Sequence, residues 1–256
     1  MYEEQPFMIK TLVLQSHRTP LPAQWINRCI SSVKNWATQY QFDYLFIGDE
    51  LYDYVPKSLL KKTKAQPIIA TDLARLRALQ FYLKQGFDRV IWCDADFLIF
   101  APDNFLLPDE PYALGREIWV QNDRKKTTKL NVYIKVHNAF MLYCKNNSFL
   151  DFYADTAERL LTLNQGQMPP QFIGPKLLTA IHNIAQCPVL ETAGMLSPRV
   201  IQDLANGTTS ALSLMKQRAT QSIFAANLCS SLYAKAEFNE QQIQQCIDKL
   251  LQQQTF

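Results

Sequence analysis

The stretch Arg89-Val-Ile-Trp-Cys-Asp-Ala-Asp-Phe-Leu-Ile-Phe100 places two carboxylates, Asp94 and Asp96, inside an apolar run. The apolar residues on either side have the composition of buried strands, so unpaired acids between them would be costly unless a cation neutralised them. At a strand end, one carboxylate can hold a divalent metal that carries a diphosphate, and the other can hold a sugar or ribose hydroxyl. A strand that simply ends in an acidic turn is the competing interpretation.

Composition sets the outer bounds. The 256 residues, 48% hydrophobic and 19% charged, fit one globular domain spanning 1–256. The formal net charge is +3, and the basic clusters are short. Without a long Lys/Arg stripe we expect no nucleic-acid partner and at most peripheral membrane contact.

The cysteines and the N-terminus indicate a compartment. The six cysteines lie far apart and show no metal-ligand spacing, so we expect reduced and mostly buried thiols. Residues Met1–Met8 lack the pattern of a signal peptide, and no apolar run reaches the length of a membrane span. Together these features predict a cytoplasmic protein.

The first half of the chain reads as strand, helix, strand, at 8–14, 23–40 and 44–47, which is the start of an open parallel sheet. We then expect Thr71 to cap a helix whose apolar face continues to Leu83. Gly86 would end this helix. This helix would place Asp72 and Arg75 on one side of its first turn, where an acid loosely paired with an arginine is the bland interpretation.

The second half predicts strands at 111–114, 131–136 and 138–143 and a helix at 149–163. Gly174 and Pro175 should open a further helix that runs to Ile184. A Gln-rich helix is expected at about 239–253. No internal repeat is visible.

Ordered blocks of this sequence resemble the glycosyltransferases with a DXD-containing sugar-binding region, the family that includes the initiating α-1,6-mannosyltransferases of the Golgi. The likeness spans roughly residues 9–235. The family's usual Tyr-Gly-Gly-x-Tyr-x-Asp-x-Asp is replaced by Gly86-Phe-Asp-Arg-Val-Ile-Trp-Cys-Asp94, which leaves the subfamily open. The blocks are residues 9–25, Thr71-Asp-Leu-Ala-Arg75, Asp94-Ala-Asp96, Asn138-Ala-Phe-Met-Leu and Phe172-Ile-Gly-Pro-Lys-Leu-Leu-Thr179.

The resemblance implies a Rossmann-like α/β fold of the nucleotide-diphospho-sugar transferase (GT-A) type, with a mixed central sheet flanked by helices. A nucleotide-sugar half at about 8–110 would be followed by an acceptor half at about 111–235 and a C-terminal helix at 236–256. The implied activity is transfer of a hexose from a UDP- or GDP-sugar to a glycan or lipid-linked acceptor, with retention of configuration and with Mn²⁺ or Mg²⁺.

The resemblance also implies the central site residues. Asp96 would ligate the metal, and Asp94 would hold ribose, sugar or a metal-bound water. Asp72 would accept hydrogen bonds from sugar hydroxyls, and Arg75 would contact the sugar or its phosphate. Asn138 would complete the catalytic set beside the reacting sugar, unless it only satisfies a turn. Because the acids look uncompensated, we expect removal of Asp96 to leave the fold intact.

Three further positions are assigned more weakly. Gln15 and His17, in the loop after the first strand, are candidates for nucleotide contact. Asn227 stands where the family pattern Ala-x-His-x-x-x-Ser-Trp has a histidine that reaches the metal. In the alternative, Asn227 ends a short buried strand and binds the backbone.

Two other functions compete. A catalytically inactive nucleotide-sugar-binding or scaffold protein of the same fold is compatible with the low glycine content, 7 residues in all. A nucleotidylyltransferase would also place acids near a metal, but it needs a Gly-rich basic loop, which Gln15-Ser-His-Arg-Thr-Pro lacks.

Overall fold

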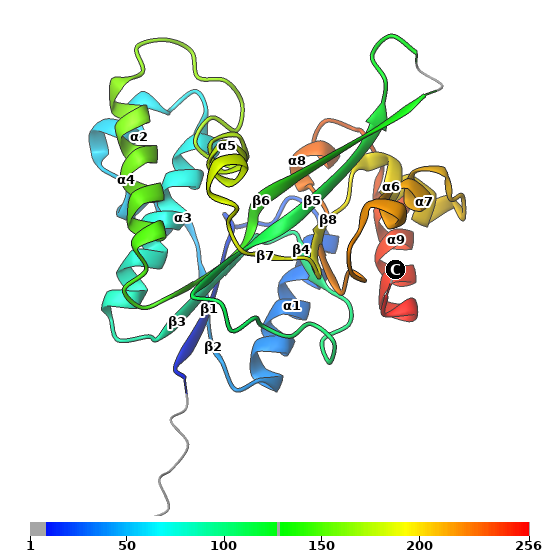
Figure 1. Cartoon of the computed structure of the whole chain (residues 1–256), viewed down its shortest axis with the longest axis horizontal. Coiled ribbons are helices and arrows are strands. Elements are labelled where there is room, and N and C mark those ends of the chain that lie inside the picture. The colour runs from blue at the N-terminus through cyan, green and yellow to red at the C-terminus, as the bar shows by residue number, and fades with distance from the viewer. Residues whose placement is uncertain (1–8, 127–128, 256) are drawn as a thin grey trace, which may run out of the picture.

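A computed structural model describes residues 9–126 and 129–255, so the expected strand start at Met8 and the stretch Met1–Met8 lie outside the described residues. The fold is mixed α/β, with a six-stranded sheet in the order β2-β1-β3-β6-β5-β7 and a three-stranded sheet in the order β4-β9-β8 (Figure 1). The expected mixed central sheet is therefore confirmed. The strands are β1 (Thr11–Ser16), β2 (Asp43–Ile47), β3 (Arg89–Cys93), β4 (Phe97–Ile99), β5 (Tyr112–Asn122), β6 (Leu130–Cys144), β7 (Val189–Leu190), β8 (Ala193–Met195) and β9 (Ala225–Asn227).

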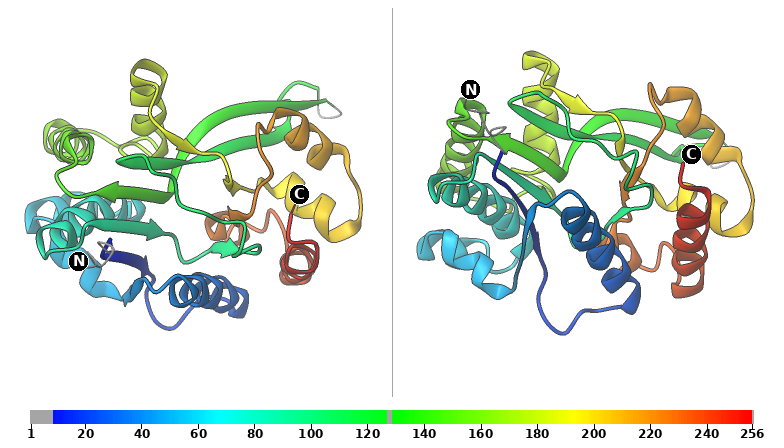
Figure 2. Two further views of the ribbon diagram at one scale, coloured as in Figure 1. Left: turned by 60° about the horizontal axis from the view of Figure 1, so that its bottom comes forward. Right: turned by 90° about the horizontal axis from the view of Figure 1, so that it is seen from below.

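Helices cover both faces of the large sheet, as Figure 2 shows with α1 on one side of the strands and α4 and α5 on the other. Val33 and Trp36 of α1 belong to the same apolar cluster as Ile91 of β3. Trp92, the next residue of that strand, belongs instead to the cluster that contains residues of α3 and α4. The helices are η1 (Asp49–Tyr54), α1 (Gln24–Gln39), α2 (Lys57–Lys62), α3 (Pro67–Lys84), α4 (Ser148–Leu163), α5 (Pro175–Ala185), α6 (Pro198–Asn206), α7 (Ser210–Arg218), α8 (Ser230–Tyr233) and α9 (Glu240–Gln253).

The first half of the chain has Rossmann-like order. Strand β1 pairs in parallel with β2 on one side and with β3 on the other. The chain therefore reverses its winding direction between β1 and β3. In open α/β sheets, ligands bind outside the carboxyl ends of the strands at such a switch point. Here those ends carry Gln15 and the segment Asp94–Asp96.

Helix α3 begins earlier than expected. It starts at Pro67 with Gln66 as its cap residue, so the prediction that Thr71 is the N-cap was wrong. Proline suits the first helical position because its φ angle is fixed and its missing N–H is not needed there. Thr71 instead donates a 3.2 Å hydrogen bond to the Pro67 carbonyl. Asp72 and Arg75 thus lie one turn further into the helix than predicted.

Strands β5 and β6 form a long hairpin. The sequence predicted instead a short strand at 111–114 and two separate strands at 131–136 and 138–143. The break predicted at residue 137 coincides with an irregularity rather than an end. Leu114 pairs with Met141, but Gly115 pairs with His137, so three residues of β6 bulge out of the register. The inserted residues begin with Asn138, and the bulge therefore re-aims this side chain.

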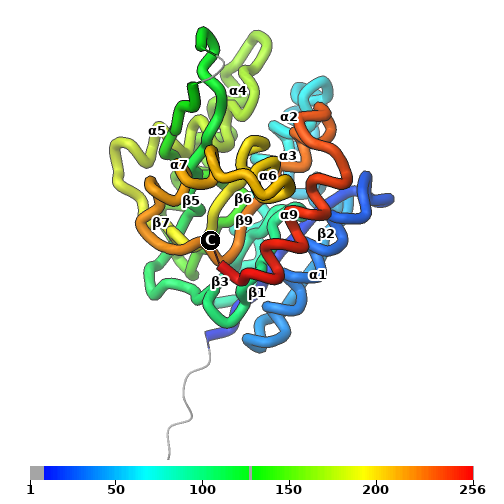
Figure 3. Tube along the Cα trace, turned by 90° about the vertical axis from the view of Figure 1, so that its right-hand side faces the viewer, coloured from blue at the N-terminus to red at the C-terminus, as the bar shows by residue number. Residues whose placement is uncertain are grey.

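The C-terminal part builds a second core. Buried residues of α6, α7 and α9 share one apolar cluster with Trp25, Ile26 and Cys29 of α1. Figure 3 shows α9 (red) crossing beside α1 (blue). The Gln-rich helix was correctly predicted, and Asn239 caps it with a complete capping box. All six cysteines are free, and only Cys144 among them is not buried.

Within the described ranges, none of the helices combines the length and the apolar character that crossing a bilayer requires.

Candidate active site

The chain turns after β3 and sends Asp94 and Asp96 to different partners. In a continuous strand, residues two apart share a face. Here Phe97 N donates to Asp94 O at 3.0 Å, and the chain passes from the large sheet into β4 of the small one. Asp94 N also donates to Ala139 O at 2.8 Å, which fixes the turn against β6. The two carboxylates therefore lie in separate environments.

Asp94 is held by a cation and an indole. Its Oδ1 lies 3.0 Å from Nη1 of Arg75 and accepts a 2.7 Å hydrogen bond from Nε1 of Trp92. The Arg75 guanidinium carbon lies 5.3 Å from the centre of the Trp92 ring. Burial raises the pKa of Asp94 to about 6, with Arg75 and Trp92 opposing the rise and Asp96 adding to it. The side chain keeps 25% exposure, so a ligand can reach it.

Arg75 joins α3 to β6. Its Nη1 donates to the Asn138 carbonyl at 2.9 Å, and its Nη2 lies 3.4 Å from Asp72 Oδ1. Asn138 Nδ2 donates to the same Asp72 oxygen at 2.9 Å. Asp72 and Arg75 do pair, as the bland interpretation described. Asn138 lies in their network, because the bulge of β6 turns its side chain toward α3.

Asp72 keeps one oxygen without a partner. Its Oδ2 is buried and has no hydrogen bond. Burial raises the pKa of Asp72, and Arg75 and Asn138 oppose the rise. A Cβ atom at Gly174 would collide with this oxygen, so the chain that enters α5 can approach only because residue 174 is glycine. A hydroxyl donor from a ligand would satisfy Oδ2.

Asp96 is compensated by N–H groups. Its Oδ1 accepts a 2.6 Å hydrogen bond from Asn227 Nδ2, and its Oδ2 accepts one of 2.6 Å from Ser230 N at the start of α8. Asn227 Oδ1 accepts from Cys229 N at 2.9 Å. Asn227 therefore ends β9 and binds the backbone, as the alternative interpretation had it. Both ends of its amide are engaged, which does not fit the role of metal ligand.

Asp94 is the more accessible ligand for a metal that arrives with its substrate, because Asp96 is 7% exposed and both of its oxygens already accept hydrogen bonds. Among the described residues, no three His, Cys, Asp or Glu side chains gather into a metal-binding group. Asp94 and Asp96 supply carboxylate oxygens, which hard divalent cations prefer, and Mg²⁺ is commonly held by one or two carboxylates together with substrate phosphates. Asn227 and Ser230 would then orient Asp96 as supporting hydrogen-bond donors.

Gln15 supports the turn from within. The side chain is fully buried; its Nε2 donates to the Asp94 carbonyl at 3.1 Å, and its Oε1 accepts from Tyr44 OH at 3.0 Å. It therefore joins the carboxyl end of β1 and the turn after β3 to Tyr44 near the start of β2, and it does not face a ligand. His17 lies in the loop after β1, half-buried, with Nδ1 2.8 Å from Arg18 O. Its contact with a nucleotide stays a prediction.

One residue of the site was not foreseen. Trp92 could have been found, because a residue two before Asp94 in a strand lies on the same face. His137, the residue before the bulge, is engaged inside the protein. Its Nδ1 accepts from Ala139 N at 3.2 Å, and its Nε2 lies 3.2 Å from Ala193 O. Burial lowers the pKa of His137 to about 4, so the ring is neutral at pH 7.

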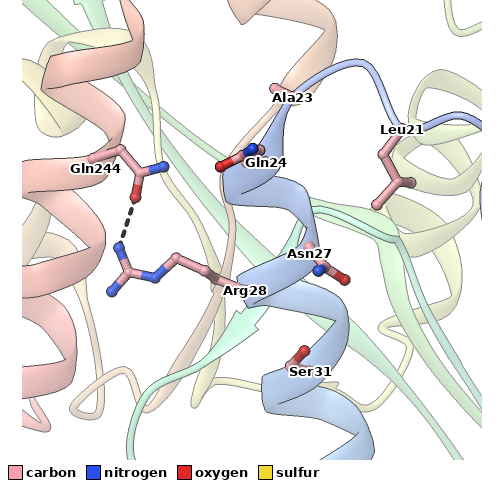
Figure 4. A pocket seen from close by; sticks show the side chains of 7 residues that line it. All are labelled: Leu21, Ala23, Gln24, Asn27, Arg28, Ser31 and Gln244. Atoms are coloured by element: carbon pink, nitrogen blue, oxygen red, sulfur yellow. Dashed lines mark hydrogen bonds between the residues drawn. The ribbon is translucent and has the colours of Figure 1, made fainter.

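A separate surface pocket lies between α1 and α9 (Figure 4). Its volume is about 620 Å³. Across it, Arg28 Nη1 donates to Gln244 Oε1 at 2.7 Å. No carboxylate is among its described lining residues, so it is a junction between helices and not the acidic site. The lining residues are Leu21, Ala23, Gln24, Asn27, Arg28, Ser31 and Gln244.

Comparison with known proteins gives similarity in fold only. No family model and no curated protein matches the chain. A glycosyltransferase involved in glycosylation of the major capsid of PBCV-1 is 10% identical with a TM-score of 0.46, over 88% of this chain and 96% of that one. The galactosyltransferase LgtC, solved with donor and acceptor sugar analogs, is 12% identical with a TM-score of 0.38, over 86% and 87%. GlyE from Streptococcus pneumoniae is 8% identical with a TM-score of 0.41, over 96% and 64%. These values are too low to carry an activity to this chain.

Proposed function

We propose that the protein is a GT-A-type glycosyltransferase that transfers a hexose from a UDP- or GDP-sugar to a glycan or lipid-linked acceptor. The observation that carries the proposal is the convergence of Asp72, Arg75, Asp94 and Asn138 at the switch point between β1 and β3. Three elements far apart in the sequence supply these groups. The stability of an apolar core does not require such a network, because burying charged groups costs free energy.

The proposal gives the polar groups distinct tasks. The unpartnered Oδ2 of Asp72 accepts a hydroxyl of the donor sugar once the chain at Gly174 shifts away from it. Arg75 Nε is also buried without a partner. It is the remaining donor of this guanidinium, because Nη1 and Nη2 already face the Asn138 carbonyl and Asp72. Asn138 holds Asp72 in place with its amide and Arg75 with its carbonyl. Preorganised groups of this kind act without reorganising during the reaction.

Asp94 and Asp96 would hold Mn²⁺ or Mg²⁺ together with the donor diphosphate. The bound ion would neutralise the charge that accumulates on the leaving diphosphate.

We include retention of anomeric configuration in the proposal. His137 is an unsuitable general base, because both of its ring nitrogens are engaged inside the protein. The acceptor proton would then pass to the leaving phosphate.

A donor screen tests the proposal directly. Thermal unfolding is measured with UDP- and GDP-sugars, each with and without Mn²⁺, because a ligand that binds only the folded state raises the transition temperature. We expect a shift with at least one nucleotide sugar. Product anomers from a positive donor are then assigned by NMR. Binding of a donor without transfer would support the inactive scaffold, whereas binding of none would contradict the proposal.

Arg75→Lys separates a site role from a surface role. We expect transfer to fall by about tenfold or more, because a point charge cannot reproduce the contacts of the planar fork. Arg77→Lys is the matched control: Arg77 lies on the same helix but pairs with Asp155 and Glu158 at its surface. Equal kinetics in the two variants would show that Arg75 only stabilises the helix.

A further inference from the structure

One face of the β5–β6 hairpin carries a row of matched side chains. Glu117 lies opposite Lys135, and Trp119 lies opposite Tyr133. Residues directly opposite in an antiparallel pair point to the same side. The contacts agree, since Lys135 Nζ lies 3.5 Å from Glu117 Oε1 and 5.7 Å from the centre of the Tyr133 ring. Gln121 continues the row and accepts a 3.0 Å hydrogen bond from Trp119 Nε1.

Glu117, at the inner end of this row, is 7% exposed, whereas Trp119, Gln121, Tyr133 and Lys135 are half-buried or exposed. Ile118 and Val120 point to the other side, are 2% and 0% exposed, and belong to the cluster with α6, α7 and α9. Tyr133 is 42% exposed, and the Lys135 side chain is also 42% exposed. We call the residues Glu117, Trp119, Gln121, Tyr133 and Lys135 the hairpin face.

The hairpin face begins two residues along β5 from the bulge that carries Asn138 of the candidate active site. Gly115 pairs with His137, the residue before Asn138, and Glu117 pairs with Lys135. From Glu117 the row runs outward along a hairpin that projects from the body of the molecule (Figure 1).

The outer end of the hairpin is basic. Arg124, Lys125, Lys126 and Lys129 are all exposed. The nearby Asp123 directs its Oδ1 to the backbone N–H groups of Lys125 and Lys126, at 2.8 and 2.9 Å. The surplus of positive charge is complementary to an anionic ligand.

We infer, on the basis of the proposed function, that the hairpin face binds the acceptor and that the acceptor is an acidic oligosaccharide. Sugar rings present apolar C–H faces that pack on aromatic rings, while their hydroxyls bond to the acid and amide beside those rings. Successive rows on one face lie about 7 Å apart, comparable with the length of a hexose ring, so consecutive sugars can meet consecutive rows. The basic tip then attracts the carboxylate or phosphate groups of the chain.

Binding to immobilised hexasaccharides tests the inference without turnover. The probes are a hyaluronan fragment with uronic acids, a phosphorylated mannan fragment and neutral maltohexaose. We expect the wild type to bind an acidic probe more tightly than the neutral one, and less tightly as salt rises. Trp119→Ala and Tyr133→Ala should each weaken binding by about tenfold. Trp119→Phe keeps an aromatic ring and should retain most of the binding. It serves as the control for a loss of binding that comes from misfolding.

Ile134→Ala is the control, since Ile134 is 53% exposed in the same strand but points to the opposite side. It should bind like the wild type. Unchanged binding in both aromatic variants, a preference for maltohexaose, or binding to no probe would overturn the inference. The thermal shift with nucleotide sugars, measured in parallel, separates the two failures. If the wild type shows this shift but the aromatic variants bind the probes unchanged, only the role of the hairpin face is contradicted. If the wild type shows no shift, the proposed function is contradicted.

Discussion

The most informative residue pair is Trp92 and Arg75, because together they hold one oxygen of Asp94 from two sides. The indole N–H and the guanidinium both point at Oδ1, and the indole ring also lies beside the cation. The carboxylate is thereby fixed before any ligand arrives, which is the condition for a preorganised site.

Trp92→Phe removes the indole N–H and keeps an aromatic ring beside Arg75. We expect weaker donor binding and a loss of about 1.5–3 kcal/mol in the free energy of unfolding, because the lost hydrogen bond is made to a charged group. Trp36→Phe also loses one indole hydrogen bond, to Phe105 O, but away from the site. Calorimetric titration with donor should show weakened binding only for Trp92→Phe. Equal donor affinities in the two variants would contradict the role of Trp92.

Asp96→Ala is expected to destabilise the protein, contrary to what the sequence suggested. The substitution leaves Asn227 Nδ2 and Ser230 N without an acceptor in a buried setting. We expect the free energy of unfolding to fall by about 1–3 kcal/mol, measured by urea denaturation without ligand. Asp96→Asn, which keeps an oxygen for one of the two donors, should lose less. A variant Asp96→Ala as stable as the wild type would show that these bonds contribute nothing.

At the scale of elements, the start of α5 closes over the site. Tyr153 of α4 donates to the Ile173 carbonyl at 2.9 Å, which holds the chain just before Gly174. The close approach of that backbone to Asp72 is what leaves Oδ2 buried. The position of a helix end therefore sets the environment of a carboxylate on another helix.

Gly174→Ala should disturb this contact. The new Cβ would collide with Asp72 Oδ2, so α5 or Asp72 must move. We expect a loss of about 1–3 kcal/mol in stability together with weaker donor binding. Gly166→Ala is the control, because a Cβ there meets nothing within 4 Å. Urea denaturation and donor titration of both variants check the prediction, and equal results would show that α5 does not close the site.

At the scale of the whole molecule, His137 links the two sheets and makes stability depend on pH. Its ordinary pKa of 6.5 is lowered to about 4 by burial. Below pH 6.5 the unfolded chain takes up a proton that the folded chain refuses. This contribution to stability is therefore present above pH 6.5 and is lost as the pH falls toward 4, by up to about 1.4 kcal/mol per pH unit.

His137→Gln should remove that slope. Urea unfolding of both proteins is measured between pH 7.5 and pH 5, and the difference in free energy is plotted against pH. Burial raises the pKa values of Asp72 and Glu117, which acts in the opposite direction, but both groups are present in the two proteins and largely cancel. A difference that does not change with pH would contradict the assignment of a buried neutral histidine.

The alternation of elements and the position of the acidic turn followed from the amino-acid sequence alone. Hydrophobic periodicity located α1, polar Gln-rich composition indicated α9, and Gly174 with Pro175 marked the start of α5. Such signals are local, because period and capping depend on neighbours in the chain. The Asp72 and Arg75 pair was likewise readable from its spacing, although Pro67 rather than Thr71 opens its helix.

The groups that neutralise the acids depend on the fold. The sequence indicated a cation as the partner of Asp94 and Asp96, with an acidic turn as the alternative. In the folded chain, Arg75 and Trp92 hold Asp94, while Asn227 and the N–H of Ser230 hold Asp96. Apart from Trp92, these partners are distant in sequence or depend on a backbone N–H. The packing of α3 beside β3 and the pairing of β4 with β9 bring them to the acids, and neither has a periodic signature in the chain.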